Sequence, residues 1–465
     1  MQIFLKKNSA RPSIKELHDA VERGDGEKAH KLVSNISADN WHDFLRSVRR
    51  VNSRPIYSYL AGMEGRGIGR TKPSDLSPLI YKGKVYTKTR ERGEVMALAF
   101  HYKLSAPGEL EMGKGGEMAR NSLPLLPFRE MIGTEHTKVR EVEVLKAIYG
   151  QSSKKSPGPD LFPAELYKKL SVLKEYTTAF IDLIIRKGVI PKTLKRIYLV
   201  PITKPGKDPR SVDSRRPIAL LCVIIKILET VVYHRLLPVV EPHLTPCQYA
   251  YRRGRGTEFL LIEVMDRVHR ALLGGQHVYL ASFDIRGAFD TVPHSELMAA
   301  LKRFGVDVRL RRVIHEWLRG RTFQVRMRSD AGVFYSSVHT ISRGLPQGGV
   351  LSPFLWLIFF NPVIDRMREL RMERGQPSGG TTYRDFVYAD DITSIVTAGT
   401  REELIAAAHI QVECLQQMLK ELSLSLNMSK CMNLYYNPVL FSDGIFMRPP
   451  DVRKVSTRTR LHKIY

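Results

Sequence analysis

The chain has 465 residues and carries 73 lysines and arginines against 47 aspartates and glutamates, a formal net charge of +26. An excess of this size, spread along the whole chain, favours a polyanionic partner held in an extended groove. The four cysteines are far apart, which argues against a zinc site and disulfides. The apolar stretch 350–364 is broken by prolines and too short to span a bilayer, and the N-terminal apolar run is too short for a signal peptide. We therefore expect an intracellular protein without a transmembrane segment.

The residue pattern in the first part of the chain predicts a mainly helical, basic region. Residues 13–33 have a helical pattern that begins with a capping box of Ser13 and Glu16, and a basic stretch follows at 41–54. Many glycines and few large apolar side chains make 104–122 a predicted flexible connection. We expect residues 1–130 to form this basic N-terminal region.

Residues 131–189 predict a helical extension before the main unit. Thr134 can cap a helix in which Val139, Val142, Leu145 and Ile148 recur every three residues, and which ends at Gly150. This extension leads into the part of the chain where strands begin.

From about residue 190, short β-rich runs alternate with helices. Strands are predicted at 197–202 and 278–285, a half-exposed strand at 322–327, and a helix at 309–321. The inward side of that helix is formed by apolar residues, namely Leu310, Val313, Ile314, Trp317 and Leu318. The pattern predicts an α+β unit over 190–440, and the tail 441–465 has no assigned structure.

Two acidic segments could hold metal ions. Asp390 and Asp391 are adjacent within the apolar run 386–396, which a regular half-buried strand cannot accommodate, so a hairpin tip is expected there. Asp284 ends another strand-like run. Three carboxylates at neighbouring strand ends suit two Mg²⁺ ions in an in-line displacement. Considered alone, the Asp390–Asp391 pair fits a solvated turn better.

Eight segments carry a family resemblance, and they occur in a fixed order. These are SPGPDLFPAEL (156–166), LVPITKPGKD (199–208), RPIALLCVIIKILE (216–229), QYAYRRGRGT (248–257), FDIRGAFDTVPH (283–294), RGLPQGGVLSPFLW (343–356), YADD (388–391) and LSLNMSK (424–430). Together they resemble the successive blocks of reverse transcriptases, above all those of non-LTR (LINE-like) retrotransposons. The resemblance implies the fingers and palm of a right-hand polymerase, with an antiparallel palm sheet, and RNA-directed DNA polymerase activity.

The resemblance also implies roles for single residues. Asp284, Asp390 and Asp391 would be the catalytic, metal-binding acids, with two Mg²⁺ ions that Mn²⁺ can replace. Phe289 would be the steric gate against a ribose 2′-hydroxyl, the alternative being a core phenylalanine. Asp290 falls outside the triad, where a helix cap or a turn is expected.

Further residues are implied to contact substrates, which would be dNTPs, an RNA template and a DNA primer. Gln347 and Gly348 would line the dNTP pocket, unless they form a plain turn. Lys204, Arg216 and Lys430 would bind the triphosphate side, although single cations in so basic a chain are commonly solvated. The residues expected to bind the nucleic-acid strand are the arginines that follow two tyrosines in QYAYRRGRGT, namely Arg252, Arg253 and Arg255.

The sequence departs from the family pattern in two places. Leu161 replaces a glycine of the first block, and the 29 residues after Tyr436 contain no recognisable primer-grip or thumb segment. No endonuclease, RNase H segment or Cys/His knuckle is recognised either. We therefore expect a fragment or degenerate copy with a weakened hold on primer–template. The alternatives are a catalytically silent nucleic-acid-binding remnant and an intron-maturase-like or telomerase-like enzyme. Nuclear action follows from the resemblance alone.

Overall fold

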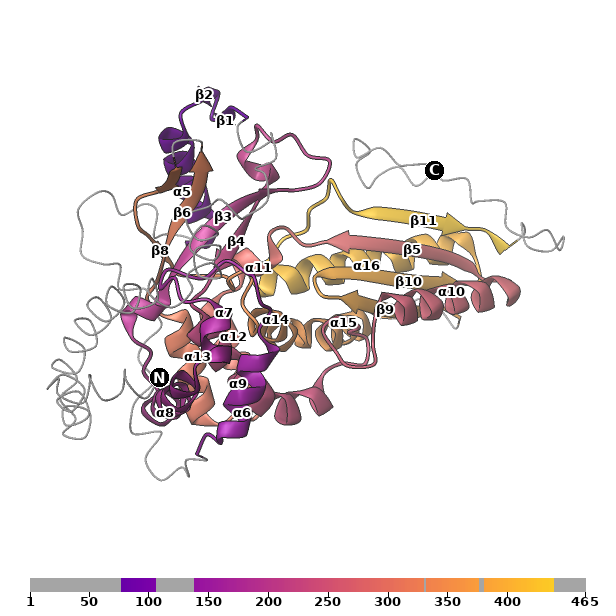
Figure 1. The fold of residues 1–465 in the computed structure, drawn as a ribbon. Coiled ribbons are helices and arrows are strands. Elements are labelled where there is room, and N and C mark those ends of the chain that lie inside the picture. Colours follow the sequence, from indigo (N-terminus) through magenta and orange to yellow (C-terminus); the bar gives the residue numbers. More distant parts are fainter. Residues whose placement is uncertain (1–76, 106–137, 330–331, 376–379, 439–465) are drawn as a thin grey trace, which may run out of the picture. The chain divides into compact units, whose positions relative to one another are not determined.

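The computed structural model describes residues 77–105, 138–329, 332–375 and 380–438 (Figure 1). The chain divides into two compact units, Met1–Lys72 and Pro73–Tyr465, and all described residues belong to the second. The helix predicted at 13–33, the basic stretch 41–54, most of the predicted connection 104–122 and the cap Thr134 lie outside the described residues. Within the described ranges, no helix is long and apolar enough to cross a membrane.

A four-stranded antiparallel sheet holds the two acidic segments (Figure 1). Its strands, in order across the sheet, are β11 (Met432–Tyr436), β5 (His277–Asp284), β10 (Asp391–Ala398) and β9 (Thr382–Tyr388). Helix α16 (Arg401–Glu421) packs against β5 and β10, and α10 (Thr257–Leu273) packs against β5, β9 and β10.

The two helices cover opposite faces of this sheet. Successive side chains of a strand point to opposite faces, so each strand contributes to the packing on both helices. Ala281 and Phe283 of β5 belong to the main hydrophobic core, whereas Val278 and Leu280 join a second core that contains the apolar side of α10. Burial on both faces explains why these strands read as apolar runs and not as a clean alternation.

A second sheet lies earlier in the chain and has the order β4 (Arg215–Leu220), β3 (Arg196–Thr203), β6 (Arg321–Ser329), β7 (Gly332–Tyr335), with β8 (His339–Ile341) also paired to β6. The β3–β6 pair is parallel and the others are antiparallel. Helix α5 (Thr89–Leu104) follows the small hairpin β1 (Leu79–Tyr81) and β2 (Lys84–Tyr86) and packs on β6 and β8. The approach is so close that a Cβ on Gly93 would lie 2.4 Å from the Phe334 ring. This packing was not predicted from the sequence.

The remaining helices pack around the two sheets and contribute to the main hydrophobic core. They are α6 (Glu141–Gly150), α7 (Ala164–Lys169), α8 (Ser171–Lys187), α9 (Val223–Val240), α11 (Ala288–Thr291), α12 (His294–Arg303), α13 (Val308–Leu318), α14 (Ser352–Phe360) and α15 (Pro362–Glu373), with the 3₁₀ turns η3 (Lys192–Lys195), η4 (Val212–Ser214) and η5 (Glu241–His243). In α14 the sequence SPFLWLIFF is apolar almost throughout, and its side chains are buried nearly all round.

The predicted strands at 197–202, 278–285 and 322–327 are confirmed as β3, β5 and β6, and β6 alternates between buried and partly exposed residues as expected. The helix predicted at 309–321 is confirmed as α13, with its five predicted apolar residues buried. It ends at Leu318, because Arg321 already begins β6.

The helix predicted from Thr134 was wrong at its start and right at its end. It begins at Glu141, with Arg140 at the N-cap, and ends at Gly150. Val142 is 46% exposed, while the buried residues are Val144, Ala147 and Ile148. A recurrence of three residues drifts around a helix of 3.6 residues per turn, so the four predicted positions cannot all share one face.

Candidate active site

The tip of the β9–β10 hairpin presents the two adjacent aspartates. Tyr388 pairs with Asp391, which leaves Ala389 and Asp390 as a two-residue loop. Ala389 takes the left-handed backbone conformation, with φ of +58°. Its carbonyl accepts a bond from Trp356 Nε1 at 2.9 Å, and its N–H donates to Gln248 Oε1 at 3.1 Å. The expected hairpin tip is therefore present, and it is fixed from both sides.

The third aspartate lies across from this tip. In the β5–β10 register, Asp284 is directly opposite Asp391. Burial and the negative charges of Asp391 and Asp284 raise the pKa of Asp390 to about 6. Burial and the charge of Asp284 also raise the pKa of Asp391. The three carboxylates thus lie close enough to repel one another.

Two side chains from the segment before β11 donate hydrogen bonds to the Asp284 carboxylate. Lys430 Nζ donates to both carboxylate oxygens, at 2.8 and 3.0 Å, and Asn427 Nδ2 donates to Oδ2 at 2.9 Å. The Asn427 N–H also donates to the Asp284 carbonyl at 2.7 Å. The sequence LSLNMSK is thereby brought to the carboxylates.

Asp284, Asp390 and Asp391 are the side chains here that could hold a divalent cation. As arranged, the described part of the chain contains no ready-made group of three His, Cys, Asp or Glu metal ligands. The donor chemistry nevertheless fits Mg²⁺, which prefers carboxylate oxygens and completes its shell with water and substrate. The mutual repulsion of the acids is the electrostatic condition that a bound cation relieves.

Phe289 lies on the short helix α11, directly after β5. Its ring stacks on Trp356, with centroids 5.2 Å apart and planes inclined by 27°. Trp356 in turn donates to the carbonyl of Ala389, so the Phe289 ring is tied to the hairpin tip through one side chain. Phe289 is only partly buried, which distinguishes it from a fully enclosed core phenylalanine.

The loop with Gln347 and Gly348 is held at both ends. Ala219 N of β4 donates to the Gln347 carbonyl at 2.6 Å. Gly348 has φ of +120°, and a Cβ there would lie 2.7 Å from the Ala219 carbonyl oxygen, so the position requires glycine. Beyond it, the buried Glu229 carboxylate accepts the N–H groups of Val350 and Leu351 at 2.5 and 3.3 Å.

Cations from separate segments share one region. Lys204 follows β3, and its Nζ donates to the Asp213 carbonyl at 2.8 Å. Burial lowers the pKa of Lys204, and the positive charges of Lys103, Lys430 and Arg216 lower it further. The predicted cations Lys204, Arg216 and Lys430 are thus brought together. Lys103 near the end of α5 was missed, because its segment lies outside all eight motif blocks.

The three arginines predicted to bind nucleic acid differ in their surroundings. Arg252 has a side chain only 8% exposed and donates to Glu241 Oε1 at 2.8 Å and to the Thr245 carbonyl at 2.7 Å. These internal bonds account for the burial of Arg252, and its contact with a nucleic-acid strand stays a prediction. Arg255 lies over the Tyr249 ring, 5.4 Å from its centroid, and Arg253 is exposed.

Asp290 was expected at a helix cap or in a turn. Gly287, not Asp290, occupies the N-cap of α11, so the capping role was wrong, whereas the turn is confirmed because Asp290 N donates to the Gly287 carbonyl at 2.8 Å. Asp290 Oδ1 instead accepts a hydrogen bond from Gln347 Nε2 at 2.7 Å. This link joins two motif blocks that the sequence treats as separate.

Comparison with known proteins identifies the family. The family model described as reverse transcriptase (RNA-dependent DNA polymerase) matches residues 202–455, and the chain belongs to this family. The matching relatives include several non-LTR retrotransposon proteins, which confirms the resemblance found in the sequence motifs.

Particular relatives come from fruit-fly mobile elements. The RNA-directed DNA polymerase from mobile element jockey of Drosophila funebris is 29% identical over 67% of this chain and 33% of that protein. A probable RNA-directed DNA polymerase from transposon BS of Drosophila melanogaster is 31% identical over 48% of this chain and 24% of that protein. The chain thus spans about a third of the length of the first relative.

Among solved structures, the truncated apo telomerase from Candida tropicalis covers 59% of this chain and 56% of its own, at 13% identity and a TM-score of 0.38. A likeness of this size is too weak to argue from.

Proposed function

We propose that the chain is an RNA-directed DNA polymerase that adds dNMP to a primer 3′-hydroxyl on an RNA template, with two Mg²⁺ ions as cofactors. The observation that carries the proposal is the register that sets Asp284 opposite Asp391, with Asp390 at the adjoining hairpin tip. Membership of the reverse transcriptase family supports the same activity.

In this proposal the β11-β5-β10-β9 sheet is the palm and the sheet of β3, β4 and β6 belongs to the fingers. The fingers and palm would extend over 190–440, preceded by a helical extension over 131–189. Support comes from the antiparallel order of the first sheet and from the placement of Gln347 against β4 of the second.

The chain's own residues would act by position and charge. Asp284, Asp390 and Asp391 would hold the metal ions, which when bound activate the primer hydroxyl and stabilise the leaving pyrophosphate. Lys204 and Arg216 would neutralise the triphosphate, because phosphoryl transfer depends on charge stabilisation more than on covalent help. Lys430 would leave Asp284 for the phosphates once the carboxylate charge is met by metal. Phe289 would exclude a 2′-hydroxyl and Gln347 would contact the nucleotide.

Primer extension on poly(rA)/oligo(dT) with dTTP and Mg²⁺ tests this function. The wild-type chain should give product that is lost with EDTA and reduced at least about 1000-fold in Asp390→Ala, since the variant removes a metal ligand. Asp365→Ala, an exposed acid on α15, is the matched control and should extend normally.

The outcome against the proposal is equally concrete. If the wild-type chain binds primer–template but gives no Mg²⁺-dependent product, or if Asp390→Ala extends like wild type, the catalytically silent remnant is the better description. For action in the nucleus, which the family membership suggests, the test is the location of a tagged chain in cells.

A further inference from the structure

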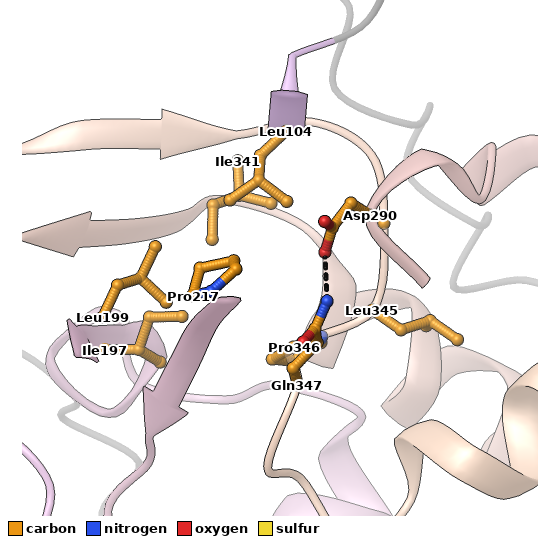
Figure 2. A pocket seen from close by; sticks show the side chains of 10 residues that line it. Leu104, Ile197, Leu199, Pro217, Asp290, Ile341, Leu345, Pro346 and Gln347 are labelled. Carbon is orange, nitrogen blue, oxygen red and sulfur yellow. Dashed lines mark hydrogen bonds between the residues drawn. The ribbon is translucent and has the colours of Figure 1, made fainter. Parts of the chain in front are cut away.

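Asp290 and Gln347 meet at the edge of a small cavity between the two motif blocks (Figure 2). The cavity has a volume of about 10 Å³, which is room for about one water molecule. Apart from these two side chains its lining is apolar or glycine, and it comes from β3, β4, β8, the end of α5 and the loop before Gln347. The Asp290–Gln347 hydrogen bond of 2.7 Å is thus made in largely apolar surroundings, where such a bond is strong.

The backbone around this bond is locked. Leu345 N donates to the Phe289 carbonyl at 2.7 Å, and Gly344 N donates to the Val292 carbonyl at 2.8 Å. Gly344 has φ of +83°, and a Cβ there would lie 2.6 Å from the Asp290 carbonyl oxygen. The loop before Gln347 therefore lies directly on α11, and Asp290 has a fixed position relative to the Gln347 side chain.

The chemistry of the pair fixes which way the Gln347 amide points. An ionised carboxylate only accepts hydrogen bonds, so it must take an N–H from the amide. The amide carbonyl is then turned away from Asp290 and, with the second N–H, is left for another partner. Burial raises the pKa of Asp290, whereas the bond from Gln347 and the charges of Lys103, Lys204 and Arg343 favour its ionised form.

We infer that Asp290 is a positioning residue that orients the Gln347 amide toward the incoming nucleotide and so contributes to nucleotide selection. The inference rests on the proposed polymerase function and adds a role that the metal-binding acids do not have. Phe289 is the neighbour of Asp290 on the same four-residue helix. One helical turn would then carry both the side chain that tests the sugar and the side chain that orients Gln347.

The test is single-nucleotide insertion on a defined RNA template, with kcat and KM measured for the correct and an incorrect dNTP. Asp290→Asn can present either a donor or an acceptor to Gln347, so it keeps the shape but no longer fixes the amide. We expect KM for the correct dNTP to rise about tenfold and selectivity to fall by a similar factor, while kcat changes less than about threefold. Asp290→Glu, which keeps an acceptor, should retain part of the selectivity.

A double-mutant cycle separates positioning from general structure. If Asp290 acts through Gln347, then adding Asp290→Asn to Gln347→Ala should change selectivity by less than about twofold. Gln411→Ala is the matched control, because Gln411 Nε2 also donates to a buried aspartate, Asp385 Oδ1, at 2.8 Å, but in another part of the core. That variant should leave selectivity unchanged, and unfolding midpoints of all variants should identify any general loss of structure.

The outcomes distinguish the inference from the function. An active wild type whose Asp290→Asn variant keeps its KM and selectivity overturns the inference alone, as does an effect that adds in full to that of Gln347→Ala. A wild type without Mg²⁺-dependent product overturns the proposed function and the inference with it.

Discussion

Phe289 combines two contacts that bear on substrate choice. Its ring is only partly buried, and its inner face lies on Trp356, whose indole N–H holds the carbonyl of Ala389 at the aspartate hairpin. The ring is therefore held firmly and yet remains accessible. A side chain in this condition can act as a steric test, because it cannot move aside without losing its stacking partner.

Removing this ring should relax sugar selectivity. Phe289→Ala opens the space that a 2′-hydroxyl would need, so the preference for dTTP over UTP in primer extension should fall at least about tenfold. Phe289→Tyr keeps the ring and is the control, with selectivity near that of wild type. Equal preference in wild type and Phe289→Ala would remove the gate role and leave Phe289 as a packing residue.

At the scale of elements, the loop from Arg343 to Leu351 is held by one strand and two helices. Gln347 and Gly348 lie against β4, Gly344 lies against α11, and Glu229 of α9 accepts N–H groups at the start of α14. Loops that present functional groups are commonly mobile, whereas this one has bonds along most of its length.

A methyl group at Gly348 should disturb this loop. Gly348→Ala would place Cβ 2.7 Å from the Ala219 carbonyl oxygen in a backbone conformation that disfavours alanine, at a cost of about 1–3 kcal/mol. We expect a lower unfolding midpoint and a rise in KM for dNTP. The control is Gly150→Ala at the end of α6, where a Cβ meets nothing within 4 Å. A Gly348→Ala protein with wild-type stability and KM would show that the close approach is easily relieved.

His294 at the start of α12 also holds the loop and makes its stability depend on pH. The ring is 7% exposed and its Nε2 lies 2.9 Å from the Gly344 carbonyl oxygen, so the neutral ring donates. Burial, which disfavours the charged ring, lowers the pKa of His294 to about 4, from the 6.5 of an unhindered histidine.

Below pH 6.5 His294 becomes protonated in the unfolded chain, whereas in the folded chain it stays neutral down to about pH 4. This contribution to stability is therefore fully present above pH 6.5 and is lost as the pH falls toward 4, by about 3 kcal/mol. Urea unfolding at several pH values should show this slope. His294→Gln keeps a donor without a titrating ring and should flatten that part of the profile, while an unchanged slope would assign it to other groups.

For the whole molecule, the charge excess has a measurable consequence. A chain with a net charge of +26 should bind primer–template by displacing counterions, so log Kd should rise steeply and linearly with log salt concentration. Arg253→Ala removes an exposed cation of the basic segment 252–255 and should lower the slope by about one unit. Arg252→Ala should lower stability instead, because its guanidinium is bonded internally. The reverse pattern would contradict both assignments.

The features predicted correctly from the sequence are those that a local residue pattern or the order of the motifs determines. Alternation and apolar spacing identified β3, β5, β6 and α13, and the charge pair in an apolar run required a hairpin tip. Pairing between distant segments was not predictable, since no local rule states that Asp391 faces Asp284 or that Lys430 reaches it. These depend on the register of three strands.

Candidate residues without a motif were the ones missed. Lys103 comes from α5, which no block covers, and its approach to Lys204 arises only from the packing of α5 on β6 and β8. A basic motif also cannot say which guanidinium is bonded internally, as that of Arg252 is to Glu241.

The two-residue tip between β9 and β10 has a consequence for how a gene of this kind can decay. A substitution within β10 alters one side chain, and the protein can lose function by degrees. Loss of a single codon there would turn every following strand residue over, so that Ile392 and Val396 would leave the main core for the face under α10, and Ile395 would leave that face for the main core. In a library of in-frame one-codon deletions, this hairpin should therefore have no partly active members.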